Sequence, residues 1–457
     1  MANLHPTPVA TVAFDESYRA HVNPEWVRLL NILGMNLRYS SCVGTELRAE
    51  DGRVILDFLS GYCVHNTGHN HPRIVAALVE ELTRCGPAML QSNVAEHAGT
   101  LAAELTRRVG GGLEKVFFCS SGSEGVESAI KFSRAHTGRS GIVYAHGAFH
   151  GLTCGALSLM GDEFWREGFG PMLPETYPVP FGDVAALERI LKKQKIAAVI
   201  LEPIQGEAGI VLPPEGYLPE VQRLCRKHGA LFVLDEVQTG LGRTGTFVAA
   251  HHYNVEPDMI VLAKALSGGL IPVAALLMRD SIYKSVYSSL KRSIVHTSTY
   301  SENSLAMRAG LTTLEVLDEE KLVARSKNLG GWLREALRAR LSQYEMVAEV
   351  RGLGLLNGIV FQAPRSVGLR LSFEAFRAVN AGMFGQMLVM RLFNRHNILS
   401  QICGNNFLVL KVAPPLVVTQ AQLECYVDAI EEVVRTIHMS SKFWTEALQL
   451  AQRALAV

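Results

Sequence analysis

An acidic residue and a lysine each follow a short apolar segment of the sequence. Asp235 comes directly after LFVL (residues 231–234), and Lys264 comes directly after MIVLA (residues 259–263). Both segments are short and contain β-branched or aromatic residues, so they are predicted to be buried strands rather than helices. A polar side chain at the C-terminal end of such a strand projects into the crevice where open α/β sheets bind ligands. Asp235 and Lys264 are therefore the first candidates for chemistry.

These two side chains suit a particular reaction chemistry. Apolar flanks leave the Lys264 amine near buried surface, which favours the neutral, nucleophilic amine that bonds to an aldehyde. A buried carboxylate such as Asp235 needs a cationic partner, which a protonated pyridine nitrogen supplies. The pair leads to the hypothesis of a pyridoxal-phosphate enzyme. The alternative is that Lys264 is an ordinary solvated surface lysine.

A possible phosphate site lies in SSGSE, between the strand-like KVFFC and a predicted helix. Ser121 and Glu124 fit the capping-box pattern. The free N–H groups and the positive dipole end of a helix N-terminus suit a phosphate monoester. An ordinary helix cap explains the same residues equally well, so both interpretations stay open.

Two further strand ends carry candidate residues. Phe149 follows GIVYA and is placed to cover a flat cofactor, although an aromatic beside Gly more often belongs to a core or a turn. Glu202 and Glu207 follow the apolar segment IAAVIL. Two carboxylates at the end of a buried strand are costly unless they are paired. We therefore expect a functional role for this pair.

Two other patterns point to rival functions. The glycines at 240, 242 and 245 spell GxGxxG after a strand, which is typical of dinucleotide-binding folds. That motif must open directly into a helix, whereas TFVAAHHYNV and Pro257 follow here, so a dinucleotide site is rejected. His65, His69 and His71 precede a helix that begins with proline, without an acidic third ligand, so no metal is predicted.

The composition limits the class of protein. With 44 basic against 43 acidic residues, the chain has no net field to attract nucleic acid or an anionic membrane surface. The eight cysteines form no CxxC pair, which argues against a zinc module or a disulfide framework and favours the cytoplasm. The N-terminus lacks a leader pattern, and no apolar run approaches the roughly 18 residues of a membrane span. A soluble cytoplasmic protein with no nucleic-acid or membrane partner is expected.

The order of segments predicts an α/β fold. Strand-like and helix-like segments alternate through residues 71–330, which indicates a large domain with a mostly parallel, doubly wound sheet. Residues 1–70 contain a hairpin around Glu50-Asp51-Gly52. Residues 331–457 show helix, hairpin and strand patterns, and end in an amphipathic segment expected to pack on its own domain. The two terminal parts are predicted to form one small α+β domain.

In order and spacing, the motifs resemble those of the class III pyridoxal-phosphate aminotransferases, a branch of the fold type I superfamily. The resemblance runs from about Leu37 to Val434 and is nearest to the ornithine and putrescine (ω-amine) branches. The matching motifs are SSGSE from Ser120, FHG from Phe149, EPIQGEAG from Glu202, LDEVQTGLGRTG from Leu234, AKALSGG from Ala263, HTSTYSEN from His296 and APPL from Ala413.

The resemblance implies roles for these residues around pyridoxal phosphate. Lys264 bonds to the cofactor and moves the proton, and Asp235 partners the ring nitrogen. Gln238 meets the ring hydroxyl. Thr299 reaches the phosphate of a neighbouring subunit, which implies a homodimer. The implied cofactor-binding set is Ser121, Gly122, Ser123, Phe149 (stacked on the ring), His150, Glu202, Asp235, Val237, Gln238, Lys264 and Thr299.

The implied substrate pocket consists of Tyr62, Cys63, Leu152, Glu207 and Lys411. Ornithine enzymes carry Arg where this chain has Leu152, and much of the family carries Arg where it has Lys411, which lacks the bidentate fork. Ser-Glu-Asn-Ser also replaces the usual Gly-Gly-Asn-Pro after the threonine. These departures favour a terminal amine, a diamine or an ω-amino acid as donor, over strict recognition of an α-carboxylate.

The expected reaction is ping-pong transamination to a keto acid such as pyruvate or 2-oxoglutarate. The alternatives within this chemistry are an ornithine or acetylornithine aminotransferase with strict carboxylate recognition, and an aminomutase or a decarboxylase. A binding protein that has lost the cofactor is the alternative from another class. The intact Lys264, Asp235 and Gln238 argue against it.

Overall fold

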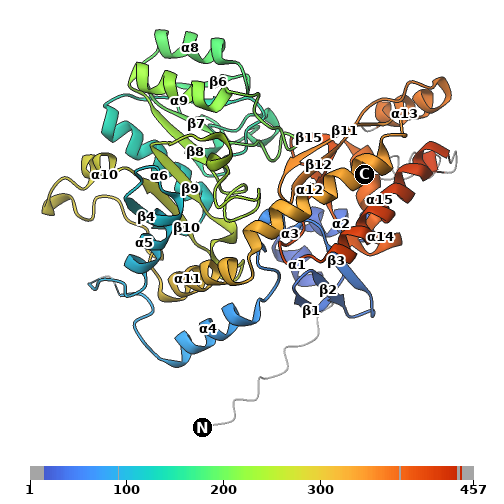
Figure 1. The fold of residues 1–457 in the computed structure, drawn as a ribbon, viewed down its shortest axis with the longest axis horizontal. Helices are drawn as coiled ribbons and strands as arrows, with labels where there is room; N and C mark the ends of the chain where they lie inside the picture. The colour runs from blue at the N-terminus through green and yellow to red at the C-terminus, as the bar shows by residue number, and fades with distance from the viewer. Residues whose placement is uncertain (1–14, 91, 380–381, 440–442, 445–457) are drawn as a thin grey trace.

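A computed structural model describes residues 15–90, 92–379, 382–439 and 443–444 (Figure 1). Residues 1–14, where no leader pattern was predicted, and most of the predicted last helix lie outside the described residues. No helix in these ranges is long and apolar enough to cross a membrane.

A seven-stranded sheet lies at the centre of the fold, with strand order β4-β10-β9-β8-β7-β5-β6. All neighbours are parallel except β10, which runs antiparallel to β4 and β9. The predicted mostly parallel sheet is confirmed, although β6 and β10 were not among the predicted strands. The strands are β4 (Lys115–Cys119), β5 (Gly141–Ala145), β6 (Thr176–Val179), β7 (Ile196–Leu201), β8 (Leu231–Asp235), β9 (Met259–Leu262) and β10 (Ala274–Met278).

Helices cover both faces of this sheet, and alternate residues of each strand face opposite cores. In β8, Val233 packs in the core that α6 (Gly122–Thr137) completes with Val126, whereas Leu234 packs in the core of the opposite face. Burial on both sides explains why the strands read as continuous apolar segments. The opposite face is covered by α4 (Pro72–Thr83), α5 (Ala98–Val109), α8 (Val184–Lys193), α9 (Tyr217–His228) and α11 (Ser304–Glu319).

Two smaller sheets lie beside the central one in Figure 1. The first has the order β1-β2-β3-β13, and its parallel pairing of β13 with β3 brings together segments from both ends of the chain. The second is antiparallel, with the order β11-β12-β15-β14. The strands are β1 (Tyr39–Val43), β2 (Glu46–Ala49), β3 (Val54–Asp57), β11 (Val347–Leu353), β12 (Leu356–Phe361), β13 (Ile398–Leu399), β14 (Gln401–Cys403) and β15 (Asn406–Val412).

Long helices pack on these small sheets, and the remaining helical elements are short. The β3–β13 pairing supports a small domain built from both ends, while its borders at residues 70 and 330 stay a prediction. The other helices are α1 (Glu16–His21), α2 (Pro24–Leu33), α3 (Ser60–Cys63), α7 (Cys154–Leu157), α10 (Asp280–Val286), α12 (Leu322–Leu341), α13 (Val367–Val379), α14 (Met383–His396) and α15 (Gln420–Met439), with 3₁₀ turns η1 (Glu163–Trp165), η2 (Ala249–Tyr253), η3 (Lys264–Ser267) and η4 (Leu290–Arg292).

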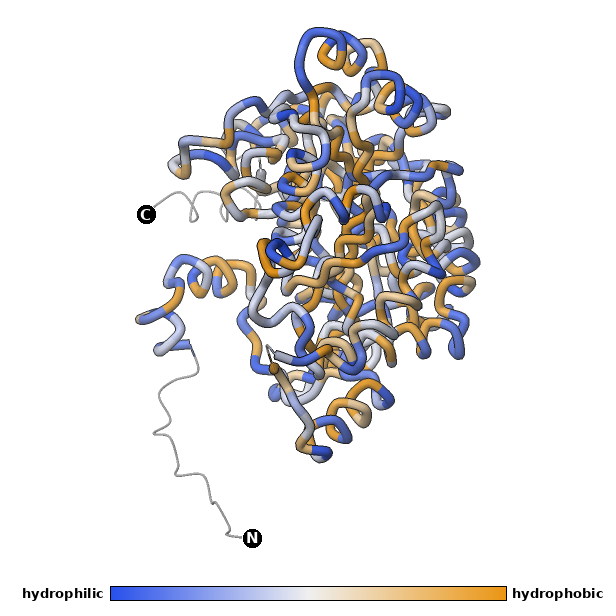
Figure 2. The backbone as a smooth tube through the Cα atoms, turned by 90° about the vertical axis from the view of Figure 1, so that its left-hand side faces the viewer, coloured by the Kyte–Doolittle hydropathy of each residue, from blue (hydrophilic) through white to orange (hydrophobic). Residues whose placement is uncertain are grey.

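Helices α1 and α2 project from the body of the molecule, as the tube in Figure 2 shows. The arm exposes apolar side chains, among them Trp26 and Leu29 on α2 and Val22 between the two helices. Such a surface on an extended arm is unusual for an isolated chain.

The GxGxxG glycines after β8 lead into a loop and η2 rather than a helix, as the rejection of a dinucleotide site requires.

Candidate active site

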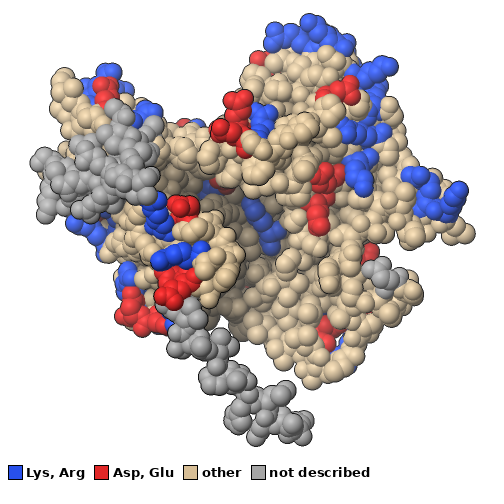
Figure 3. Space-filling model, turned by 180° about the vertical axis from the view of Figure 1, so that it is seen from behind, with Lys and Arg blue, Asp and Glu red and all other residues tan. Residues whose placement is uncertain are grey.

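A cavity of about 980 Å³ opens at the ends of several strands of the central sheet. On the face in Figure 3 the surface is hollowed between two lobes. The predicted site residues that line the cavity are Tyr62, Ser121, Gly122, Ser123, Phe149, His150, Leu152, Glu202, Glu207, Asp235, Val237, Gln238 and Lys264. Cys63, Thr299 and Lys411 do not line it.

Asp235, at the end of β8, is held by two hydrogen bonds. Its Oδ2 accepts from Nδ1 of His150 at 2.8 Å, and its Oδ1 accepts from the Val237 N–H at 3.0 Å. The side chain of His150 is fully buried, and its Nε2 has no partner within the described residues. Burial alone would lower the pKa of His150, but the hydrogen bond and charge of Asp235 raise it overall, with Glu202 adding to the effect. The His150 ring and the Val237 N–H therefore fix the position of the Asp235 carboxylate at this end of the cavity.

Glu202 holds two backbone segments of the cavity wall. One carboxylate oxygen accepts from the Phe149 N–H at 3.0 Å, and the other accepts from the Gly206 N–H at 3.0 Å. Burial raises the pKa of Glu202 to about 7; His150 opposes this shift and Asp235 adds to it. Glu202 therefore fixes the backbone position of Phe149, next to the pair formed by Asp235 and His150.

The raised pKa of Glu202 predicts a pH dependence of stability. Because the folded protein holds this proton more tightly than the unfolded chain, the stabilisation is complete below about pH 4.5 and is lost as pH rises through about 7. Glu202→Gln should therefore lose less stability than wild type between pH 5 and pH 8, as measured by thermal unfolding of the cofactor-free protein. Glu215→Gln, at an exposed carboxylate, is the control and should follow wild type. Equal pH slopes for wild type and Glu202→Gln would contradict this assignment.

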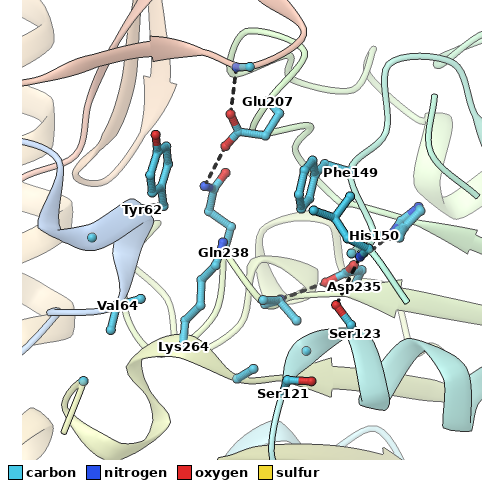
Figure 4. A pocket seen from close by; sticks show the side chains of 18 of the residues that line it. Tyr62, Val64, Ser121, Ser123, Phe149, His150, Glu207, Asp235, Gln238 and Lys264 are labelled. Carbon is cyan, nitrogen blue, oxygen red and sulfur yellow. Dashed lines mark hydrogen bonds and ion pairs between the residues drawn. The ribbon is translucent and has the colours of Figure 1, made fainter. Parts of the chain in front are cut away.

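Lys264 follows β9 in a backbone conformation that is rare for a side chain of its type. Its φ is 49°, in the left-handed region, and it begins the 3₁₀ turn η3. Strain of this kind persists where surrounding structure fixes it, often at functional sites. Figure 4 shows the half-buried side chain extending toward Gln238, between Tyr62 and the group of Phe149 and Asp235.

The N-terminus of α6 forms a cradle that fits a phosphate. Both hydrogen bonds of the capping box are present: the Glu124 N–H donates to Ser121 Oγ at 3.3 Å, and the Glu124 carboxylate accepts from the Ser121 N–H at 3.1 Å. The first N–H groups of the helix, on Gly122 and Ser123, have no acceptor within the helix itself. A Cβ on Gly151, whose φ is 117°, would lie 2.1 Å from Ser123 Oγ, so only glycine leaves this space open.

The rest of the cavity fits the ring of pyridoxal phosphate. Phe149 and Val237 line it as apolar surfaces, and Asp235 supplies a fixed negative charge. Gln238 Nε2 donates to Glu207 at 3.3 Å, while its buried Oε1 has no partner in the described part of the chain. That oxygen is free to accept from a ring hydroxyl.

Glu207, which lines the cavity, forms an ion pair with Lys411, which lies behind the cavity wall. Lys411 is fully buried on β15, and its amine lies 5.2 Å from the centre of the Tyr62 ring. The Glu207 carboxylate also accepts from the Gly404 N–H at 2.8 Å. Burial alone would raise the pKa of Glu207 and lower that of Lys411, but each partner's charge reverses this, so that the Glu207 pKa is lowered and the Lys411 pKa is raised. Lys411 is thus paired already and is not free to meet a substrate carboxylate.

Several lining residues were not predicted from the sequence. Trp165 donates to Asn405 Oδ1 at 2.7 Å and packs edge-on against Phe149, with ring centres 5.4 Å apart. The outer wall comes from α14, β14 and β15, which sequence motifs did not link to the site. These elements and the turn between β14 and β15 contribute Gln386, Gln401, Ile402, Gly404 and Phe407, while Phe164 and Trp165 belong to η1.

Thr299 lies in an exposed turn, away from the cavity of its own chain. The same segment exposes the large apolar side chains of Leu290, Ile294, Val295 and Tyr300. Within a single chain, Thr299 therefore does not reach the phosphate cradle at the N-terminus of α6.

Comparisons with known proteins place the chain in a family. The family model "Aminotransferase class-III" matches residues 33–434. Aminotransferase PigE of Serratia sp. (strain ATCC 39006) is 35% identical over 449 residues, 92% of this chain and 53% of PigE, so the chain spans about half the length of this curated relative.

Two solved structures extend the comparison. The ornithine aminotransferase of Toxoplasma gondii, described with partial occupancy of pyridoxal phosphate in its active site, is 29% identical with a TM-score of 0.79, over 88% of this chain and 91% of that one. A thermostable (S)-enantioselective ω-transaminase from Thermomicrobium roseum is 27% identical with a TM-score of 0.80, over 95% of this chain and 96% of that one. With the cavity geometry above, these matches show that the chain belongs to the class-III aminotransferases, enzymes of fold type I that use pyridoxal phosphate.

Proposed function

We propose that this enzyme transfers an amino group from a terminal amine, a diamine or an ω-amino acid to a keto acid, by a ping-pong mechanism. One observation carries the choice of donor: among the described residues that line the cavity, Lys264 is the sole lysine or arginine. Lys264 is committed to the cofactor, and Lys411 is paired with Glu207 behind the wall. In the resting site a substrate α-carboxylate therefore has no unpaired cation; the keto acid finds one only if Lys411 leaves Glu207, whereas an amine donor needs none.

The roles of the chain's own residues follow from their positions. Pyridoxal phosphate, when bound, supplies an aldehyde and a ring that accepts electrons. Lys264 Nζ takes the proton from the donor carbon that bears the amine and returns it. Asp235, fixed by His150 and by the Val237 N–H, holds a proton on the ring nitrogen. The N–H groups at the start of α6 bind the phosphate.

A comparison of matched donors tests this proposal. Putrescine and ornithine differ only by the α-carboxylate, as do cadaverine and lysine. With pyruvate or 2-oxoglutarate as acceptor, kcat/KM should be higher for each diamine than for its amino acid. We expect a ratio of about tenfold or more, because each buried charge without a partner costs over about 1.4 kcal/mol. A strong preference for ornithine over putrescine would contradict the donor proposal.

Leu152→Arg sharpens the same experiment. Leu152 is half exposed at the cavity, and an arginine there adds the missing cation. The ratio of kcat/KM for ornithine over putrescine should rise in Leu152→Arg and stay near the wild-type value in Leu152→Met, which changes shape but not charge.

A second function within the same chemistry is supported by the similarity to the T. gondii ornithine aminotransferase. In that alternative the enzyme requires the α-carboxylate of ornithine, and the comparison of matched donors would show a preference for ornithine over putrescine. An aminomutase would isomerise its substrate without a keto acid, and a decarboxylase would release carbon dioxide, so the same assays identify both.

The proposal includes a homodimer in which Thr299 reaches the phosphate of the partner subunit. Its support is the exposed apolar segment around Thr299 and the projecting arm of α1 and α2. Sedimentation should give twice the chain mass, and Ile294→Asp should shift the protein toward monomer and weaken cofactor binding. A wild-type monomer with full activity would contradict this.

A cytoplasmic location belongs to the same proposal and is supported by eight cysteines, all free.

A further inference from the structure

The turn that carries Tyr62 has a strained backbone. Ser60, Gly61, Tyr62 and Cys63 have φ values of 47°, 60°, 60° and 71°. Successive residues rarely adopt this left-handed conformation, because Cβ then approaches the following carbonyl oxygen. Three of the four are not glycine, so contacts around the turn must hold it. Figure 4 shows the Tyr62 ring at the cavity, at the end of this turn.

Ser60 anchors the turn through hydrogen bonds of both its backbone and its side chain. Its N–H donates to Oδ1 of Asp57 at 2.8 Å, and its carbonyl accepts from the N–H groups of residues 64 and 65 at 2.8 and 3.0 Å. Its hydroxyl donates to the Ala413 carbonyl at 2.7 Å and accepts from Nη2 of Arg243 at 3.2 Å. Ser60 itself is fully buried.

Arg243 ties the turn to three other segments. Its buried guanidinium donates to the Leu355 and Pro414 carbonyls at 3.0 and 2.6 Å, and to Asn66 Oδ1 at 2.6 Å, besides Ser60. All four acceptors are uncharged. A planar fork with five N–H groups reaches acceptors in several directions, which a lysine does not.

We propose that Ser60 and Arg243 are positioning residues for the amine donor: they lock the left-handed turn so that Tyr62 forms the donor side of the cavity. Arg243 lies on the loop that also carries Gln238, so one segment serves both the cofactor and the donor wall. The inference rests on the proposed function, in which Tyr62 contacts the donor.

The test is a double-mutant cycle in the holoenzyme, with putrescine and pyruvate. Ser60→Ala and Arg243→Met should each raise the KM for putrescine by roughly 3- to 10-fold, with kcat and the visible absorbance of bound cofactor little changed. Neither should raise it further in a Tyr62→Ala background, because both act through Tyr62. Thr246→Ala removes a local hydrogen bond from the same loop and is the control. Arg243→Met removes four hydrogen bonds. If this variant fails to fold, Ser60→Ala alone carries the test.

Hydrogen exchange gives a second measurement that needs no activity. The amides of residues 62–65 should exchange faster in Ser60→Ala and Arg243→Met, and at the wild-type rate in Thr246→Ala. Unchanged exchange, or an equal rise in KM in both backgrounds, overturns the inference. If Tyr62→Ala leaves the KM unchanged, the inference also falls while transamination stands. If wild type transfers no amino group from any donor, the proposed function falls and exchange still reports whether the turn is held.

Discussion

Lys264→Ala is expected to lower kcat for transamination by about 10,000-fold, the upper range for loss of a positioned acid–base group. The residue follows β9 with a φ of 49°, and the strained turn directs its side chain into the cavity. Without the amine, the described part of the cavity loses the base that we assign to the proton of the donor carbon. Single-turnover kinetics, followed by the visible absorbance of the cofactor, measures the loss.

A chemical readout separates this loss from misfolding. Reduction with borohydride should attach the cofactor covalently to the peptide that contains Lys264 in wild type, and to no peptide in Lys264→Ala. Lys195→Ala, at an exposed lysine, is the control and should keep both activity and the adduct. Full turnover in Lys264→Ala would overturn the assignment of Lys264.

Asp235→Asn is expected to lower kcat by about 100- to 1,000-fold, the usual cost of removing one fixed charge at a reacting centre. The amide keeps the shape of the carboxylate but not its charge, so a proton on the ring nitrogen loses its partner. His150 loses the same charge, and with it the largest of the interactions that raise its pKa, so that only the effect of Glu202 remains in full. Cofactor affinity should fall as well, as measured by equilibrium dialysis.

Asp235→Glu is the matched control because it keeps the charge and moves it by one methylene. Its kcat should lie between those of wild type and Asp235→Asn. If the two variants lose activity equally, geometry rather than charge determines the role of Asp235. If Asp235→Asn keeps wild-type kcat, the carboxylate has no part in the reaction.

The central sheet was predictable because its strands carry their signal locally. LFVL and MIVLA are apolar on both faces, since helices cover both sides of the sheet, and these segments form β8 and β9. The hairpin around residues 50–52 and the helix from Pro72 were predicted from equally local sequence signals. β10 was missed because its residues, AALLM, include none that is β-branched or aromatic, so its strand conformation depends on pairing with β4 and β9.

The cofactor end of the site was also predictable in part, because each residue ends a strand or begins a helix. Ser121 and Glu124 form the capping box that their spacing indicated. The bond between His150 and Asp235 was not foreseen, since 85 residues separate them and only the sheet brings them together. The predicted pyridine nitrogen is thus not the sole cationic partner of Asp235.

The sequence by itself determined the enzyme family and its cofactor, and it placed the proposed site residues Lys264, Asp235 and the start of α6 at the ends of elements whose patterns are local. Only the tertiary structure decided how the donor end is built. Lys411 proved to be the buried partner of Glu207, and the turn of Tyr62 proved to be held by Ser60 and Arg243. These contacts join segments more than 180 residues apart, and such distances leave no mark in a local pattern.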